Sequence, residues 1–340
     1  MGGPGLLRRA VRRSRRLVSP AGATGPPFVP PLCATEGHAA LADTIVHPMR
    51  VGKTAEGRPI FCTGLQGRDG RFHPEGAFVR CGVRHPIFHN AHPAPVASAA
   101  AHVDEAVYCG PLFDHFGHFL LESLARLSNR PPDAPGVLLW AADAGGGGAG
   151  FRPWQREILD LLGLPAQRIA TRVPFEVRRL TVPAPGFVVR HAFTAAHAAF
   201  LSVMPWRPEP GRRVWLSRRK VPGAARPAFH ALEPALAAAG WRVIVPEDLP
   251  VRDQLAELAQ AEQVAGEMGS ALHALVLLDG AAGLRVDIFP RPPGPGMPEL
   301  NDNYRAIAER KGFDQRVHVV EEATTARPET LRSWCVERLA

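Results

Sequence analysis

The sequence predicts an α/β fold whose second half forms a doubly wound parallel sheet. Between residues 213 and 289, short apolar runs alternate with helical segments in units of about thirty residues, which is the rhythm of such a sheet. A similar alternation runs from residue 106 to 183. The chain of 340 residues is long enough for two domains, and a hydrophobic fraction of 46% against 21% charged residues supplies a core.

The chain begins with a basic and proline-rich segment, which we interpret as a flexible tail over residues 1–35. This segment lacks the apolar stretch of a secretory signal, and the alternative is a short amphipathic helix that rests on an anionic membrane. We expect an N-terminal α/β domain at 36–205, a C-terminal Rossmann-like domain at 206–292 and a helical segment at 293–340. A proline-rich stretch marks the junction between the two domains.

The net charge and the cysteine content indicate which classes of partner and which cellular compartment to expect. The formal net charge of +8 favours polyanionic partners such as nucleotides, phosphates or anionic lipid surfaces. Nucleic acid is not expected, because the basic residues beyond the tail are spread out and aromatic residues make up only 7%. The 5 cysteines are odd in number and form no C-x-x-C pair, which indicates a reducing compartment. We therefore expect a cytoplasmic protein, with peripheral membrane contact through the basic N-terminus as an option.

The first half of the chain mixes turn-rich and βα segments. Apolar runs broken by glycine and proline predict β-rich structure over residues 38–105. Strands are then predicted at 106–109, 136–140, 169–170 and 179–182. Helices are predicted at 116–127 and 154–162.

The second half is more regular. Strands are predicted at 213–218, 241–245, 263–267 and 284–289. Helices are predicted at 229–239, 251–261, 271–278, 304–311 and 328–339. In a doubly wound sheet, ligands bind at the carboxyl ends of the strands. That edge would collect the polar residues Arg218, Arg219, Lys220, Glu247, Glu267, Gly269, Ser270 and Asp287.

The Gly269-Ser270 pair opens the helix predicted at 271–278 and is a candidate anion site. Free amides at a helix start favour an anion such as a pyrophosphate, and Gly269 would let a phosphate approach the backbone. Arg218 and Lys220 leave a strand end towards the same crevice and would neutralise a diphosphate. A plain Gly-Ser helix cap and an ordinary charged loop are the alternatives. Together the two features favour a nucleotide or nucleotide-sugar site.

The helix predicted at 116–127 carries a polar stripe. Asp114, His118, Glu122 and Arg126 follow each other at i,i+4 and would share one face. An aspartate, a histidine and a glutamate in one stripe directly after a strand suit general acid or base catalysis. A solvated helix face is the alternative.

A metal-dependent hydrolase is a rival interpretation of the same stretch. His115 and His118 lie at i,i+3, with Glu122 four residues on, and such a set can bind one ion. Further ligands could come from the histidines at His85, His89 and His92. Prolines interrupt any helix that would align these three, so we interpret them as loop histidines without metal.

Three stretches, in the expected order, resemble motifs of the bacterial branch of glycosyltransferase family 61, the capsular-polysaccharide-type proteins. Residues 116–122, Phe-Gly-His-Phe-Leu-Leu-Glu, followed by Arg-Leu, are similar to Y/F-G-H-W/F-L-L-D/E followed by R-L. Residues 214–218, Val-Trp-Leu-Ser-Arg, are similar to a strand ending in S-R. Residues 266–273, Gly-Glu-Met-Gly-Ser-Ala-Leu-His, are similar to G-x-H-G-S/A-G-L-x-N, and residues 284–290 resemble the following V-x-E-I-x-P.

This resemblance implies a GT-B fold, in which two Rossmann-like doubly wound domains face a cleft and the last helix crosses back to the first domain. It implies an inverting, metal-independent transfer of a sugar from a nucleotide-sugar donor to a hydroxyl of a saccharide or glycolipid acceptor, without a cofactor. Surface or capsular polysaccharide biosynthesis is the implied pathway.

The resemblance also implies roles for single residues. His118 matches the family histidine and is the first candidate for the base, with Glu122 and Asp114 as alternatives or as its supports. Arg218 and the backbone amides near Gly269 and Ser270 would stabilise the diphosphate, beside the Lys220 already placed at the strand end. Residues that would hold ribose hydroxyls are Glu247 or Asp287.

The chain departs from the family pattern at its third stretch. Met268 stands where the family commonly has histidine, and Ala271 where it commonly has glycine. His273 falls near the position where the family more often has asparagine one step later. These departures leave open a catalytically degenerate nucleotide-binding module as an alternative.

Overall fold

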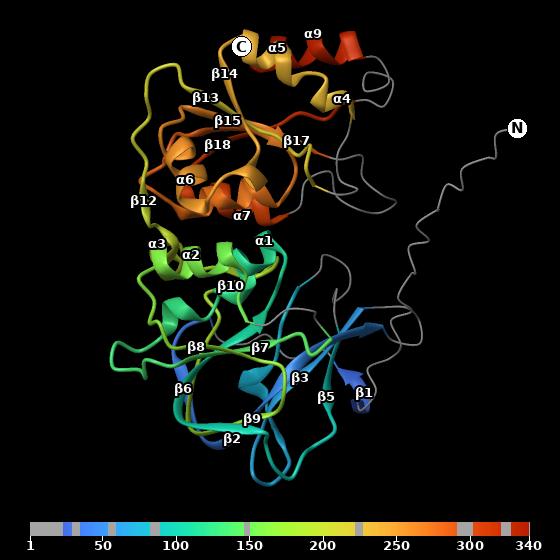
Figure 1. Ribbon diagram of the computed structural model, residues 1–340, viewed down its shortest axis with the longest axis vertical. Helices are drawn as coiled ribbons and strands as arrows, with labels where there is room; N and C mark the ends of the chain where they lie inside the picture. The colour runs from blue at the N-terminus through green and yellow to red at the C-terminus, as the bar shows by residue number, and fades with distance from the viewer. Residues whose placement is uncertain are drawn as a thin grey trace, which may run out of the picture.

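The computed structural model describes residues 23–28, 35–53, 59–81, 89–145, 150–221, 227–290, 302–320 and 328–339. Most of the tail predicted at 1–35 lies outside these residues. Two main sheets lie one above the other, with a layer of helices between them and further helices above the upper sheet (Figure 1). The lower sheet belongs to the first half of the chain and the upper sheet to the second half.

The sheet of the first half has nine strands in the order β1-β5-β3-β2-β9-β6-β7-β8, with β4 paired to β3. These strands are β1 (Ala23–Phe28), β2 (His38–Lys53), β3 (Pro59–Gln66), β4 (Phe72–His73), β5 (His89–Pro93), β6 (Ala101–Leu112), β7 (Leu138–Ala142), β8 (Arg168–Thr171) and β9 (Phe175–Pro183). Strands β9, β6, β7 and β8 are parallel, whereas β2 is antiparallel to β3 and β9. The predicted β-rich segment and the predicted parallel βα unit after it are therefore confirmed.

The sheet of the second half is parallel throughout and has the order β14-β13-β15-β17-β18. Its strands are β13 (Arg213–Leu216), β14 (Trp241–Ile244), β15 (Gln263–Glu267), β17 (Arg285–Phe289) and β18 (Asp314–Val317). The chain leaves β13 for β14 on one side and returns for β15 on the other. The carboxyl ends of β13 and β15 therefore form the switch point at which such sheets bind ligands.

Strand β18 is absent from the sequence-based prediction. Three of its four residues are polar, and it is a mostly exposed edge strand, so the apolar alternation that predicts a strand is missing. Two short strand pairs complete the description: β10 (Phe187–Val188) with β11 (Ala192–Phe193), and β12 (Met204–Pro205) with β16 (Leu278–Asp279).

The helices form two layers. Those between the sheets are α1 (Phe116–His118), α2 (Pro153–Leu161), α3 (Ala195–Leu201), α6 (Val251–Ala259), the 3₁₀ helix η5 (Ser270–Leu277) and α7 (Asp302–Lys311). Those above the second sheet are α4 (Pro227–His230), α5 (Glu233–Ala238) and α9 (Pro328–Leu339). Short helical turns are η1 (Pro74–Gly76), η2 (Phe119–Ser123), η3 (Leu127–Asn129) and η4 (Pro246–Asp248).

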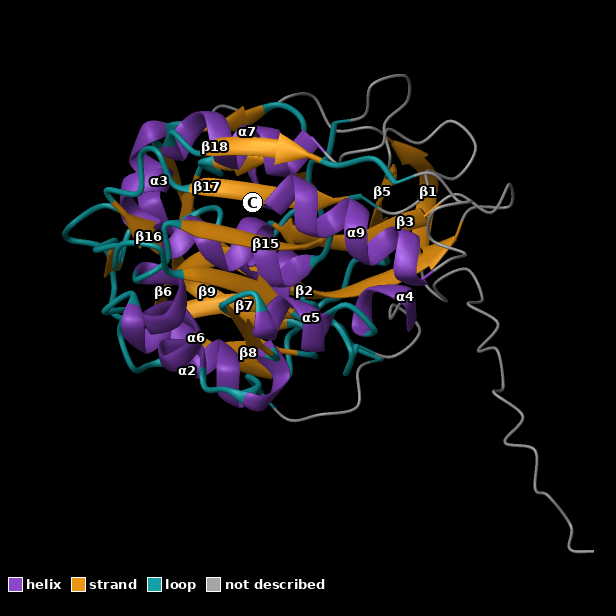
Figure 2. Cartoon of the chain, turned by 90° about the horizontal axis from the view of Figure 1, so that it is seen from above, coloured by secondary structure: helices purple, strands orange, loops and turns teal. Residues whose placement is uncertain are grey.

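Two helices of the second half differ from expectation. The helix predicted at 229–239 is divided into α4 and α5. Pro234 has no backbone N–H, so it cannot continue α4, but it is favourable in the first turn of α5. The last helix, α9, packs Leu331 and Cys335 against the second sheet and does not cross back to the first half. Figure 2 shows α9 lying over the strands of that sheet.

The two halves are joined by apolar packing and by polar contacts, among them those of Glu157 and Lys311. One hydrophobic cluster runs through both halves. Glu157 of α2 accepts hydrogen bonds from the backbone N–H groups of Val251 (2.9 Å) and Arg252 (2.8 Å), at the positive end of the dipole of α6. Nζ of Lys311 donates to the Leu278 carbonyl at 2.9 Å and to Ser202 Oγ at 2.7 Å.

Within the described residues, no helix combines the length and the apolar character needed to cross a bilayer.

Asp287 is fully buried in β17 and forms a structural ion cluster. Its carboxylate accepts hydrogen bonds from Gln263 (2.8 Å), Arg285 (2.9 Å) and His318 (2.6 Å). Burial alone would raise the pKa of Asp287, but the hydrogen bonds from His318 and Gln263 and the charge of Arg285 outweigh it and lower the pKa.

We predict that Asp287→Asn lowers the free energy of unfolding by about 3 kcal/mol, because it leaves the partly buried Arg285 without the charge of its fully buried partner. The lowered pKa means that this contribution is complete above about pH 3.9, the usual aspartate value, and fades as the pH falls through the native pKa. Urea unfolding from pH 7 down to pH 3 measures both effects. The exposed Asp253→Asn is the control, with a change within about 0.5 kcal/mol. Equal stability of Asp287→Asn and wild type would contradict the structural role.

Candidate active site

The stretch after β6 is not the regular helix predicted at 116–127. One turn of α-helix, α1, passes into the π-helical turn η2, in which Leu124 N donates to Phe119 O at 3.2 Å. Tertiary contacts fix this turn: Ser123 Oγ accepts from Phe113 N at 3.0 Å, and Trp140 Nε1 donates to Ser123 O at 2.8 Å. Such turns are frequent at functional sites. The predicted i,i+4 relation survives only between His118 and Glu122.

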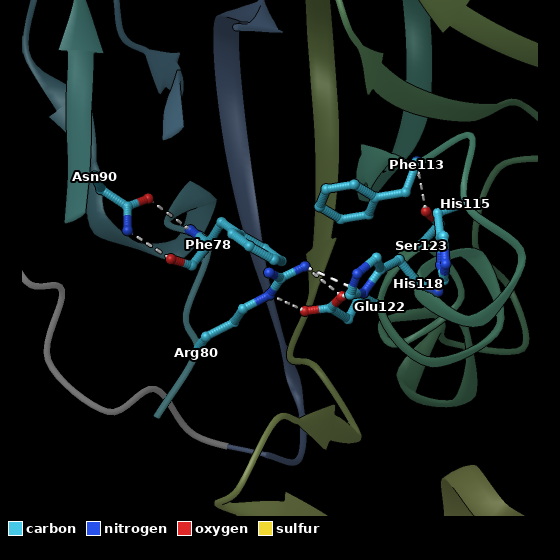
Figure 3. A network of polar contacts seen from close by, with 8 residues as sticks. All are labelled: Phe78, Arg80, Asn90, Phe113, His115, His118, Glu122 and Ser123. Carbon is cyan, nitrogen blue, oxygen red and sulfur yellow. Dashed lines mark hydrogen bonds and ion pairs between the residues drawn. The ribbon is translucent and has the colours of Figure 1, made fainter. Parts of the chain in front are cut away.

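Arg80, Glu122 and His118 form one polar network (Figure 3). Arg80 binds both carboxylate oxygens of Glu122, through Nε to Oε1 and through Nη2 to Oε2 at 2.6 Å. Nδ1 of His118 lies 2.6 Å from Glu122 Oε2. The Glu122 side chain is 3% exposed, whereas the His118 side chain is 42% exposed. The buried carboxylate thus connects a buried arginine to a histidine that reaches the surface of the site.

The guanidinium of Arg80 is held by its surroundings. It lies 5.2 Å from the ring centre of Phe78 and 5.5 Å from those of Phe61 and Phe113, at cation–π distance. The backbone of Phe78 is in turn fixed by Asn90 of β5, which accepts from Phe78 N at 3.2 Å and donates to Phe78 O at 2.6 Å. Figure 3 shows Asn90 and Glu122 on opposite sides of this segment.

The network determines the protonation of its members. Burial alone would raise the pKa of Glu122, but the charge of Arg80 and the hydrogen bonds from His118 and Arg80 outweigh it, so the pKa is lowered and the carboxylate stays ionised. A nitrogen 2.6 Å from a carboxylate oxygen carries the proton, which assigns the proton of neutral His118 to Nδ1. The lone pair then lies on Nε2.

His115 and Arg218 connect this network to the second half of the chain. The ring of His115 lies 4.7 Å from that of His118. Burial lowers the pKa of His115, and the charges of His118 and Arg218 lower it further. Arg218 follows β13 and is 6% exposed. The arginine at the strand end therefore lies within electrostatic reach of the histidines after β6.

Gly269 and Ser270 lie at the start of η5, beside Arg218. A Cβ atom at Gly269 would overlap Nη1 of Arg218, so the guanidinium occupies the space that we expected a phosphate to use. The backbone of Gly269 is extended (φ −176°), and the need for glycine is therefore one of space and not of conformation. The guanidinium of Arg218 and the start of η5 therefore form one positively polarised surface.

Gly117 brings the two surfaces together. A Cβ atom at Gly117 would lie 3.2 Å from Cβ of Ser270 and 3.1 Å from Cε1 of His273. His273 is buried, stacks on Tyr304 of α7 with ring centres 4.7 Å apart, and has no hydrogen-bond partner among the described residues. Burial, followed by nearby His118 and His115, lowers the pKa of His273 to about 3 and keeps it neutral.

A cavity of about 280 Å³ lies between the two halves next to this contact. Asp114, Phe116 and Trp154 line it from the first half. Glu247 and Ser270 line it from the second half, at the ends of β14 and β15. Its size approaches the lower end of common ligand sites.

The structure separates several predicted residues from the network. Asp114 pairs with Arg152 at 2.9 Å and not with His118. Lys220 pairs with Asp248 on the surface, and Asp287 is buried within its sheet. Arg126, the last residue of the predicted stripe, is buried and donates to the carbonyls of Pro183, Glu75 and Ala77. Among the predicted residues, His118 and Glu122 contact each other, and Arg218, Gly269 and Ser270 lie together opposite them.

The histidines of the metal interpretation do not assemble. Within the described residues, no group of three or more histidine, cysteine, aspartate or glutamate side chains is placed to hold a metal ion. His89 and His92 lie in β5 and not in a loop, where His92 stacks on Phe72 with ring centres 4.2 Å apart. His85 lies outside the described residues.

Comparison with protein families adds one finding. Residues 116–284 match the model of the family described as Glycosyltransferase 61, a family of transferase enzymes, which implies that the chain transfers a sugar from a donor to an acceptor. No curated protein matches the chain. The matched range contains His118, Glu122, Arg218, Gly269 and Ser270, whereas Arg80 precedes it.

We predict that Gly269→Ala displaces the guanidinium of Arg218, because the added methyl group overlaps it while the backbone tolerates any residue. The free energy of unfolding should fall by about 1–3 kcal/mol. Urea unfolding measures this loss, and a crystal structure shows the position of Arg218. Gly136→Ala is the matched control, because its Cβ would meet open space. An unmoved Arg218 in Gly269→Ala would refute the packing argument.

Proposed function

Because the chain carries, over residues 116–284, a domain of glycosyltransferase family 61, we propose that it is an inverting glycosyltransferase that moves a sugar from a nucleotide-sugar donor to a saccharide hydroxyl. The observation that carries this proposal is that two polar surfaces, one from each half of the chain, lie opposite each other. The buried Arg80–Glu122 pair supports His118 on one side, and Arg218 lies over the start of η5 on the other.

His118 is the proposed base. Its Nε2 takes the proton of the acceptor hydroxyl as the hydroxyl oxygen attacks the anomeric carbon, and the bond from that carbon to the diphosphate breaks. Glu122 is a positioning residue in this scheme and not the base, because both of its oxygens are engaged and its pKa is lowered. Its charge stabilises the imidazolium that forms on His118.

Arg218 and the backbone amides at the start of η5 are the proposed stabilisers of the leaving diphosphate. Arg218 is buried and in place before a ligand arrives, so it loses little freedom when the negative charge develops. The 280 Å³ cavity next to it is the proposed donor pocket, with Glu247 for ribose hydroxyls and Trp154 as an apolar wall. Asp114 and its partner Arg152 then lie on the side of the donor sugar.

The family resemblance supports finer points of the proposal. These are a GT-B arrangement of two domains, catalysis without a metal ion, and a role in surface or capsular polysaccharide biosynthesis at the cytoplasmic side of a membrane. A glycolipid acceptor would fit contact between a membrane and the basic N-terminus.

We predict that His118→Ala lowers the rate of sugar transfer by roughly 100- to 10,000-fold, because the general base is lost. The fold should remain, since the His118 side chain is 42% exposed. The measurement is release of nucleoside diphosphate from sugar nucleotides in the presence of saccharide acceptors, with donors first chosen by thermal shift.

Exposed His102→Ala in β6 is the control and should keep wild-type activity. Glu122→Gln should reduce the rate and also the stability, because Arg80 then loses its charged partner. If no UDP-, GDP-, CMP- or dTDP-sugar shifts the melting temperature of the wild type or turns over, the proposed function fails.

A further inference from the structure

A second hollow between the two halves lies on the β10–β11 side of the network. We propose that it binds the anionic group of an acidic acceptor, a saccharide that carries a carboxylate or a phosphate. The hollow has a volume of about 560 Å³ and lies between the β10–β11 hairpin and α7. The hairpin contributes Phe187, Phe193 and Arg190, and α7 contributes Arg305 and Arg310.

The hollow has positive charge to offer an anion. Arg190 is committed to Asp302 at 2.8 Å, which fixes its side chain at the inner wall. Arg305 and Arg310 are exposed and have no ion pair with any described residue. Among the described residues, the only other acidic lining residue is Glu309, so the described arginines outnumber the described carboxylates. A guanidinium matches the geometry of carboxylates and phosphates, and the aromatic rings suit the apolar face of a sugar.

The turn that carries Arg190 is held in an unusual shape. Arg190 has φ +60°, the left-handed region that residues with a side chain seldom adopt. His191 N donates to Val188 O at 3.0 Å and closes the turn. Strained residues of this kind persist where the surroundings hold them, and they gather at binding sites.

The hollow is close enough to the proposed base for one acceptor to reach both. Cys81 N donates to Val189 O at 3.0 Å, and these two residues are the chain neighbours of Arg80 and Arg190. The backbones of the two arginines therefore lie on the order of 10 Å apart. On the other wall, Tyr304 of α7 stacks on His273 beside Gly117. The donor cavity is lined by other residues, which leaves this hollow for the acceptor.

The test is calorimetric titration of the full chain with three probes: methyl glucuronoside, glycerol phosphate and neutral methyl glucoside. We expect at least one anionic probe to bind about tenfold more tightly than the neutral one, the gain of a charge-assisted hydrogen bond. The variant Arg305→Gln/Arg310→Gln should remove this gain. The control Arg71→Gln/Arg332→Gln removes the same charge from exposed positions elsewhere and should preserve it.

Preference for the glucuronoside alone identifies a carboxylate acceptor, and preference for glycerol phosphate alone identifies a phosphate. Equal affinity for all three probes, or an equal loss in the control variant, overturns the inference. The inference rests on the proposed function, but different experimental results would contradict the inference and the function. If the function fails, no sugar nucleotide binds the wild type, whereas if only this inference fails, donors still bind and the charge of the probe has no effect.

Discussion

The site depends on a close approach that only a glycine permits. Gly117 presses against Ser270 and His273, and any side chain there would push α1 away from η5. The shared apolar cluster and the contacts of Glu157 and Lys311 hold the two halves in register around this point. This contact brings together the segments that carry His118 and Arg218, although the two residues follow strands of different sheets. Neither half contains all residues of the candidate site on its own.

A second constraint is electrostatic. A buried carboxylate would ordinarily take up a proton, and a neutral Glu122 could not stabilise an imidazolium. Arg80 prevents this by binding both oxygens within a wall of aromatic rings. Burial lowers the pKa values of His115 and His273, and neighbouring positive charge lowers them further, from His118 and Arg218 at His115 and from His118 and His115 at His273. These two histidines therefore favour the neutral form, and the arginines carry the fixed positive charge.

The sequence predicts those parts of the structure that arise locally. Short apolar runs identified four of the five strands of the second sheet, and i,i+4 spacing brought His118 to Glu122. Tertiary contacts decided the rest. The π-helical turn follows from the bonds of Ser123 with Phe113 and Trp140, which no spacing reveals. Arg80 lies 42 residues before Glu122, in a segment without periodicity, and only the folded chain brings them together. The one available signal was an arginine beside phenylalanines in a turn-rich segment.

The residues proposed for the donor and those proposed for the acceptor come from different parts of the chain. On the donor side, Arg218, Ser270 and Glu247 lie within the range that matches the family, and Asp114 lies two residues before it. The other side draws on Arg80 before that range and on α7 after it. Arg305 and Arg310 are exposed, and a change there disturbs no core packing and no contact of the donor cavity. In the proposed scheme, substitution on α7 can therefore change the preferred acceptor while the proposed roles of His118 and Arg218 stay intact.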